Sequence, residues 1–246
     1  MPGDLPERLA LFTLQFSLCL LLASPAAASD ALWQRAVAIS AYNRDVVPGS
    51  WVERKEVFNG EGESHLVSRT HVGFKQIGSK VDVFLVEATT NGEDITLQLQ
   101  EVFEEKQKDF SLKPQYNPFL PGNQKDISAK REGRSRRDGE VTHIAYDYTQ
   151  KSPDGRWRGL VWIDETTGMP LEATARLTGL PKKDGKDEIK EVVLNVTFEN
   201  GPEQRWYPSR ITIFNRSILN DFPYSKFYAT IETSTTFDKY WQITFH

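Results

Sequence analysis

The chain has 246 residues, of which 39% are hydrophobic and 26% are charged, and this composition excludes a disordered or collagen-like chain. Thirty basic and 34 acidic side chains give a net charge of -4, so there is no basic excess to attract a polyanion, and nucleic-acid binding is not expected. The single cysteine excludes an internal disulfide and any zinc site built on several thiolates.

The first 28 residues are typical of a secretory signal peptide. An apolar run over 9–23 is followed by small residues and by Ala26-x-Ala28, a typical cleavage signal. The run is shorter than the roughly 20 apolar residues that a membrane-spanning helix needs. We therefore expect residues 1–28 to be removed and residues 29–246 to form a single β-rich domain that is exported to the periplasm and soluble there. An uncleaved N-terminal anchor is the alternative.

The mature chain is predicted to start with a helix and to continue as antiparallel strands. Apolar residues at helical spacing predict a helix over 30–42, with Asp30 as its cap. Beyond it, strand-like runs alternate with turn signals such as Asn59-Gly60 and Asn91-Gly92. The predicted strands are 51–58, 64–74, 81–90, 156–164, 169–177, 191–199, 207–215, 227–237 and 240–245.

The strand predicted over 191–199 shows the clearest alternation of apolar and polar side chains. Its apolar residues are Val192, Leu194, Val196 and Phe198. One apolar and one wet face indicates an antiparallel sheet rather than a parallel α/β core. We therefore predict a mainly β fold, a strongly curved antiparallel sheet (a half-open barrel) whose concave side is covered by the N-terminal helix and by an internal helix.

The middle of the chain departs from the strand pattern. A second amphipathic helix is predicted over 95–110. Prolines then block regular structure over 114–122, which places Tyr116, Phe119 and Leu120 on a loop. These three side chains either tuck into the core or form a lid or tip that contacts a membrane or partner.

Residues 125–137 form a basic cluster for which two interpretations are open. Six Lys and Arg side chains stand against Asp126 and Glu132. The cluster is either a solvated hairpin or a surface attracted transiently to anionic head groups. No aromatic residue interrupts it, so base stacking is not expected.

No catalytic arrangement is found. His65 and His71 lie on one predicted strand but about 20 Å apart, too far to bind one metal together. Neither His-Glu-x-x-His nor Gly-x-Ser-x-Gly occurs. Asp164 and Glu165 fall in a predicted turn, where acidic residues serve turn geometry. We expect no enzymatic activity, no metal and no cofactor.

Residues 158–171, RGLVWIDETTGMPL, resemble the G-x-V-W-I-D-x-x-T-G-x-P hairpin of LolA/LolB-like outer-membrane lipoprotein-sorting proteins. Trp206-Tyr207-Pro208 and the segment 237–241 fit the same group. The resemblance implies a half-open antiparallel barrel with helices closing one side, which carries an acylated ligand, a lipoprotein or a lipid, through the periplasm.

The acyl chain is expected to lie on the concave face of the sheet. Alternation along the predicted strands assigns five large side chains to that face, Trp51, Phe84, Trp162, Phe198 and Phe214. The alternative function is that of a periplasmic sensor that binds a partner protein or a mislocalised lipid.

Overall fold

The computed structural model describes residues 30–42, 46–77, 80–105, 117–180, 188–200, 206–219, 227–238 and 241–242. The predicted signal peptide lies outside these residues. The helices are α2 (Ala31–Tyr42), α3 (Thr96–Glu105) and the 3-10 helix η2 (Pro121–Asp126). The strands are β1 (Val46–Val47), β2 (Ser50–Phe58), β3 (Ser64–Ile77), β4 (Lys80–Thr90), β5 (Glu93–Asp94), β6 (Ile127–Asp138), β7 (Val141–Ser152), β8 (Gly155–Asp164), β9 (Pro170–Thr178), β10 (Glu188–Asn200), β11 (Trp206–Leu219), β12 (Phe227–Asp238) and β13 (Trp241–Gln242).

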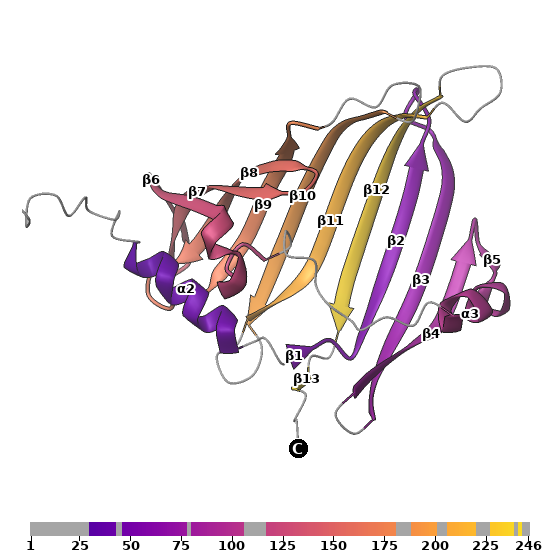
Figure 1. Ribbon diagram of the computed structural model, residues 1–246, viewed down its shortest axis with the longest axis horizontal. Helices are drawn as coiled ribbons and strands as arrows, with labels where there is room; N and C mark the ends of the chain where they lie inside the picture. The colour runs from indigo at the N-terminus through magenta and orange to yellow at the C-terminus, as the bar shows by residue number, and fades with distance from the viewer. Residues whose placement is uncertain are drawn as a thin grey trace, which may run out of the picture. The chain divides into compact units, whose positions relative to one another are not determined.

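Eleven of these strands form one antiparallel sheet in the order β5-β4-β3-β2-β12-β11-β10-β9-β8-β7-β6. Strands β2, β3, β11 and β12 arc side by side in Figure 1. β5 and β6 are the two edges, so the sheet is open. β1 and β13 form a separate two-stranded ladder. The predicted class is confirmed, since the described part of the chain is mainly β with an N-terminal helix and a short internal one.

Outside the middle of the chain, the elements predicted within the described residues agree with the structure. Of the strand predicted over 240–245, only Trp241–Gln242 (β13) is described, and the remaining residues lie outside the described part. The expected helix over 30–42 is α2, and the helix expected over 95–110 is α3, which is described from Thr96 to Glu105. The basic segment 125–137 was interpreted as a solvated hairpin, and residues 127–138 form the edge strand β6, one arm of a hairpin with β7. The partner strand β7 was not predicted. In β7 the apolar and aromatic residues alternate less regularly than in β10.

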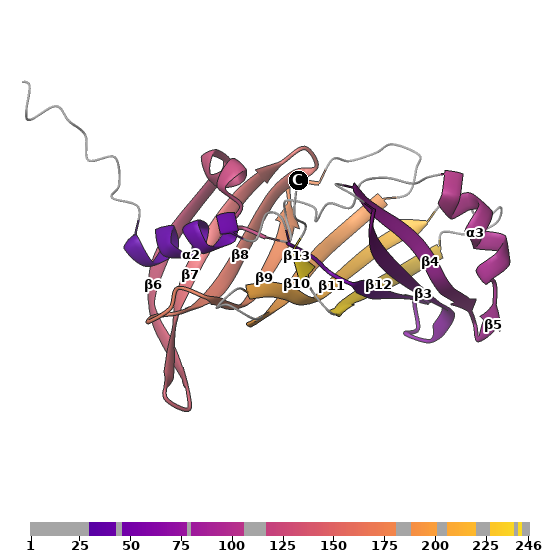
Figure 2. The same cartoon turned by 90° about the horizontal axis from the view of Figure 1, so that it is seen from below.

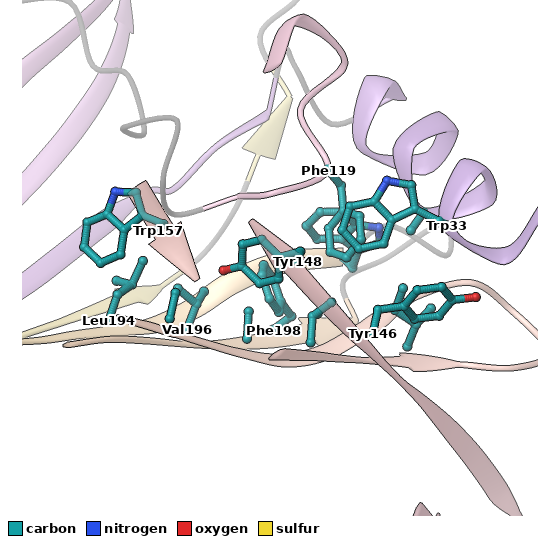
Figure 3. Packing of buried hydrophobic residues seen from close by; sticks show 14 of the residues in the cluster. Trp33, Phe119, Tyr146, Tyr148, Trp157, Leu194, Val196 and Phe198 are labelled. Atoms are coloured by element: carbon teal, nitrogen blue, oxygen red, sulfur yellow. The ribbon is translucent and has the colours of Figure 1, made fainter. Parts of the chain in front are cut away.

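The main core lies on one face of the sheet, called here the core face and defined by Val161, Ile163, Leu194 and Val196. All four side chains are buried, and the burial of Leu194 and Val196 agrees with the alternation predicted in β10. Helix α2 covers this face through Trp33, whose ring centroid lies 5.7 Å from that of Tyr146 in β7. Figures 2 and 3 show α2 beside these strands and Trp33 above them. The opposite side of the sheet is called the outer face.

The loop after residue 116 belongs to this core, which corrects the lid interpretation for Phe119. That side chain is 0% exposed. Its ring lies beside Trp33 (Figure 3), with 4.8 Å between the ring centroids, and its centroid is 5.8 Å from that of Trp206. A buried hydrogen bond from Asn117 Nδ2 to Ser40 Oγ, 3.1 Å long, ties the loop to α2. Prolines made this segment irregular without keeping it out of the core.

Hydrogen bonds to Gln124 in η2 fix the same loop from its other end. Trp33 Nε1 donates to Gln124 Oε1 at 3.0 Å, and Gln124 Nε2 donates to the carbonyl oxygens of Pro118 and Leu120. One amide side chain therefore joins the helix to the loop. The Leu120 carbonyl also accepts a backbone hydrogen bond from Asn123 at 3.0 Å, so Gln124 adds a second partner there. Leu120 itself is half-buried, and Tyr116 lies outside the described residues.

Candidate functional site

Two apolar clusters occupy the core face, and Trp51 contacts both. The main cluster spans β7 to β11, and the second consists of Val72, Phe74 and Val83 on β3 and β4. The Trp51 ring centroid lies 4.9 Å from that of Phe74, and Phe103 of α3 packs against the same group. Trp51 is half-buried. It therefore links the part of the sheet under α2 with the part beside α3.

Phe198 is the second predicted ligand residue found on the core face. It is buried in the main cluster, and its ring meets Trp206 edge-on with 5.1 Å between centroids. The direction predicted for Trp51 and Phe198 from alternation is thus the one observed. Binding of a ligand by either remains a prediction.

The direction predicted for Trp162 is wrong. Its strand neighbours Val161 and Ile163 are fully buried on the core face, so Trp162 lies on the outer face. There the guanidinium carbon of Arg136 stacks 5.2 Å from the indole centroid, and Arg136 Nη1 is 2.9 Å from Glu172 Oε1. A cation–aromatic pair at an exposed site contributes about 0.5–1 kcal/mol.

The directions predicted for Phe84 and Phe214 are wrong for the same reason. Phe84 follows the buried Val83 in β4 and is 44% exposed. Its ring covers Gly73 on the outer face, where a Cβ at Gly73 would lie 2.5 Å from the ring. Phe214 follows Ile213, which packs against the main core, and carries the guanidinium of Arg216 at 5.9 Å.

The basic cluster at 125–137 forms the exposed strand β6, and three of its arginines have carboxylate partners. These ion pairs are Arg131 with Glu165, Arg134 with Asp147, and Arg136 with Glu172. All six side chains are substantially exposed, so each pair contributes little to stability. The pairing favours the solvated interpretation of the cluster.

A pocket that the sequence did not indicate is lined by residues of the neighbouring strands β6 to β10 and by Met169, which precedes β9. Its volume is about 180 Å³, and it is lined by Asp138, Val141, His143, Asp164, Met169, Pro170, Leu171 and Phe198. His143 and Asp164 are opposed in the β7–β8 ladder. The sequence signal was weak, because an isolated histidine and a turn aspartate are common in any chain.

His143 is buried, and one of its two ring nitrogens has no hydrogen-bond partner among the described residues. Its side chain is 6% exposed, and its Nδ1 atom has no hydrogen-bond partner there. An unsatisfied buried polar atom costs about 1–3 kcal/mol.

Asp164 is held as a carboxylate beside this histidine. Its Oδ1 accepts backbone hydrogen bonds from Thr166 at 2.7 Å and from Thr167 at 3.1 Å. Partial burial acts to raise the pKa of Asp164, but the hydrogen bonds from Thr167 and Thr166 and the charge of His143 outweigh it, so that the pKa lies below its usual value. The group is ionised at neutral pH.

Metal-binding clusters and membrane-spanning helices are both absent from the described residues. No group of three or more His, Cys, Asp or Glu side chains is arranged to hold a metal ion there. No helix in the same residues is long and apolar enough to cross a membrane.

No protein-family model matches the sequence, and a search of curated proteins finds no similar sequence. Similar solved structures include a LolA superfamily protein from Nitrosomonas europaea, with 11% identity over 85% of this chain and 92% of that chain and a TM-score of 0.33. A domain described as an outer membrane lipoprotein-sorting protein from Vibrio parahaemolyticus has 11% identity over 86% and 94% with a TM-score of 0.38. A DUF1329 family protein from Desulfovibrio piger has 10% identity over 85% and 92% with a TM-score of 0.35.

Two of these solved structures are described as a LolA superfamily protein and as a lipoprotein-sorting domain. Residues 158–171 resemble a hairpin motif of that same group of proteins. Identities and TM-scores this low say nothing about a ligand or an activity. Both have to be sought in the side chains of this chain.

Proposed function

We propose that the mature protein is a periplasmic carrier that binds the acyl chain of a lipid or lipoprotein on the core face of its open sheet, and that it is not an enzyme. The observation that supports this proposal is the position of Trp51. This half-buried indole lies between two apolar clusters, where an extended hydrocarbon chain can contact both.

The energetics of such binding need no strong polar contact. Each buried CH₂ contributes about 0.8 kcal/mol, so burying most of a sixteen-carbon chain contributes on the order of 10 kcal/mol. Association itself costs about 4–15 kcal/mol. Most of the acyl chain must therefore be buried for micromolar binding. Truncating an aromatic side chain that contacts the acyl chain should weaken this binding measurably.

Titration with a fluorescent fatty-acyl probe tests the proposal, and two tryptophans on opposite faces give a matched pair of variants. Trp51→Ala should weaken probe binding at least fivefold. Trp162→Ala should leave it unchanged, because Trp162 lies on the outer face under Arg136. Circular dichroism and urea unfolding of both variants separate lost binding from lost folding.

A second measurement avoids the loss of packing that alanine causes. Brominated fatty acids quench tryptophan only at short range, and Trp51→Phe keeps an aromatic ring at this position. Quenching should be stronger in the wild type than in Trp51→Phe. Absence of saturable probe binding, or equal binding by Trp51→Ala and the wild type, would overturn the carrier proposal and favour the sensor function.

A further inference from the structure

Basic side chains gather on the outer face, at the end of the sheet that holds the turn between β7 and β8. Trp157 and Leu177 are buried in the main core, so the arginines next to them in β8 and β9 point to the outer face. Arg216 of β11 lies on that face with Phe214, whose ring it covers. The group, called here the basic patch, consists of five exposed side chains, Lys151, Arg156, Arg158, Arg176 and Arg216.

Two cross-strand pairs in the basic patch carry the same charge. Lys151 is opposite Arg156 in the β7–β8 ladder, and Arg158 is opposite Arg176 in the β8–β9 ladder. Directly opposed residues share a face of the sheet, with Cβ atoms about 4.5–5.5 Å apart, so like charges at such positions are destabilising. The fold therefore keeps two repulsive pairs side by side, and a bound anion would relieve the repulsion.

Carboxylates within the molecule compensate little of this charge. Glu191 is 3.1 Å from Arg176 and 3.8 Å from Arg216, so one carboxylate serves two guanidinium groups. The other three basic side chains of the patch form no ion pair within the described residues. Asp154, in the adjoining turn, is exposed and forms none there either.

A second pair of opposed arginines shows how such charges are compensated elsewhere in this sheet. Arg54 of β2 is opposite Arg69 of β3. Arg54 forms an ion pair with Glu56 and Arg69 forms one with Glu87, so each guanidinium has a carboxylate of its own. The basic patch lacks this compensation, and its positive charge is available to an external anion.

The composition of the basic patch favours a bilayer surface over a protein as its partner. The patch extends over β7 to β11, five neighbouring strands about 4.8 Å apart, which gives a width of roughly 20 Å. Protein interfaces depend on buried aromatic and apolar anchors, and no well-exposed large apolar side chain of the described residues belongs to the patch. Ile189 is the nearest in sequence, but it is opposite the buried Ser217 and so lies on the core side.

We propose that the basic patch docks this protein on a membrane surface rich in anionic lipids, through contacts between its arginines and the phosphates of negatively charged head groups. Arginine forms two parallel hydrogen bonds to a phosphate group. Each basic residue near such a surface strengthens binding about fivefold. The patch lies on the face opposite the proposed acyl site, so docking leaves the core face uncovered. This inference does not depend on acyl binding.

Flotation of the protein with lipid vesicles tests the proposal. The protein should float with vesicles of phosphatidylglycerol and phosphatidylcholine in equal parts and not with vesicles of phosphatidylcholine alone, and added salt should release it because ions screen the charges. Arg158→Gln/Arg176→Gln should bind the anionic vesicles about tenfold more weakly or worse. Arg54→Gln/Arg69→Gln is the matched control, because it removes the same charge from the compensated pair, and it should bind nearly as the wild type does.

Three results would overturn the proposal, namely no flotation with anionic vesicles, equal flotation with both kinds of vesicle, or equal losses in the two double variants. Binding to poly-L-glutamate without binding to anionic vesicles would also overturn it and would favour an acidic protein as the partner. Urea unfolding verifies that both double variants keep the fold. Trp51→Ala should bind anionic vesicles as the wild type does, so failure here and failure of the carrier proposal are distinguishable.

Discussion

Replacing Phe119 with alanine tests whether the segment after Asn117 belongs to the core or forms a movable lid. The ring is fully buried and lies between the indoles of Trp33 and Trp206. Both neighbours are held in place, Trp33 by its hydrogen bond to Gln124 and Trp206 by its edge-on contact with Phe198. The surroundings are therefore poorly able to collapse into the space that the ring leaves.

The expected loss follows from that geometry. Phe→Ala substitutions in protein cores cost about 3–5 kcal/mol, and the cost rises when the cavity cannot close. Two aromatic contacts, each worth about 0.5–1.5 kcal/mol beyond area burial, place Phe119→Ala in the upper half of that range. With a urea m-value of about 3 kcal/mol/M, the unfolding midpoint should fall by about 1.3–1.7 M.

Urea unfolding followed by tryptophan fluorescence measures this shift, because the substitution sits between two indoles. Leu120→Ala is the matched control. Its side chain is only half-buried, so the expected loss is about 1 kcal/mol or less. A loss below about 1 kcal/mol for Phe119→Ala would refute the core assignment, and impaired membrane or partner transfer at full stability would restore the lid interpretation.

Three further outcomes are expected. The folded-state pKa of Asp164 lies below its usual value of 3.8, so its carboxylate stabilises the fold above about pH 4, and this contribution is lost as the pH falls through the folded pKa. In urea unfolding, the difference in stability between the wild type and Asp164→Asn should therefore be largest near neutral pH and should disappear in acid. A difference that persists at low pH contradicts this. Gly159→Ala should cost about 1–3 kcal/mol in thermal or urea unfolding, because its Cβ would lie 2.7 Å from the ring of Tyr148 on the neighbouring strand. Gly122→Ala is the control and should change stability little, because a Cβ there would have no atom within 4 Å. Equal effects of the two substitutions would refute the packing argument. N-terminal sequencing of exported protein should begin within a few residues of Ser29, and a retained Met1 would show that no cleavage occurs.

Alternation in the sequence predicted well which side chains of a strand share a face. It predicted poorly which of the two faces is turned toward the core. In β10 the polar residues Asn195 and Thr197 separate the apolar ones, so the buried face was evident, and Leu194 and Val196 are indeed 2% exposed. In β8 the successive residues Val161, Trp162 and Ile163 are all apolar. Alternation alone then cannot say which face meets the core, and the largest side chain was assigned to the wrong one.

The pocket could not be predicted for a different reason. Its polar residues come from β6, β7 and β8, and each is unremarkable in its own segment. Asp164 was predicted in a turn, Asp138 was not singled out, and His143 is one histidine among four. The register of the three strands brings the pocket residues together. It pairs His143 with Asp164 between β7 and β8, and it pairs Asp138 with Val141 between β6 and β7.

The pairing of β2 with β12 determines when this sheet can be completed. β2 begins at Ser50 and β12 ends at Asp238, and their ladder is the only strand pairing in the described sheet that joins β2–β5 to β6–β12. Contacts between residues so distant in sequence form slowly, and a chain is synthesised from its N-terminus. The early strands β2 to β4 must therefore wait, with the edge of β2 unpaired and open to other chains, until the last long strand has been made.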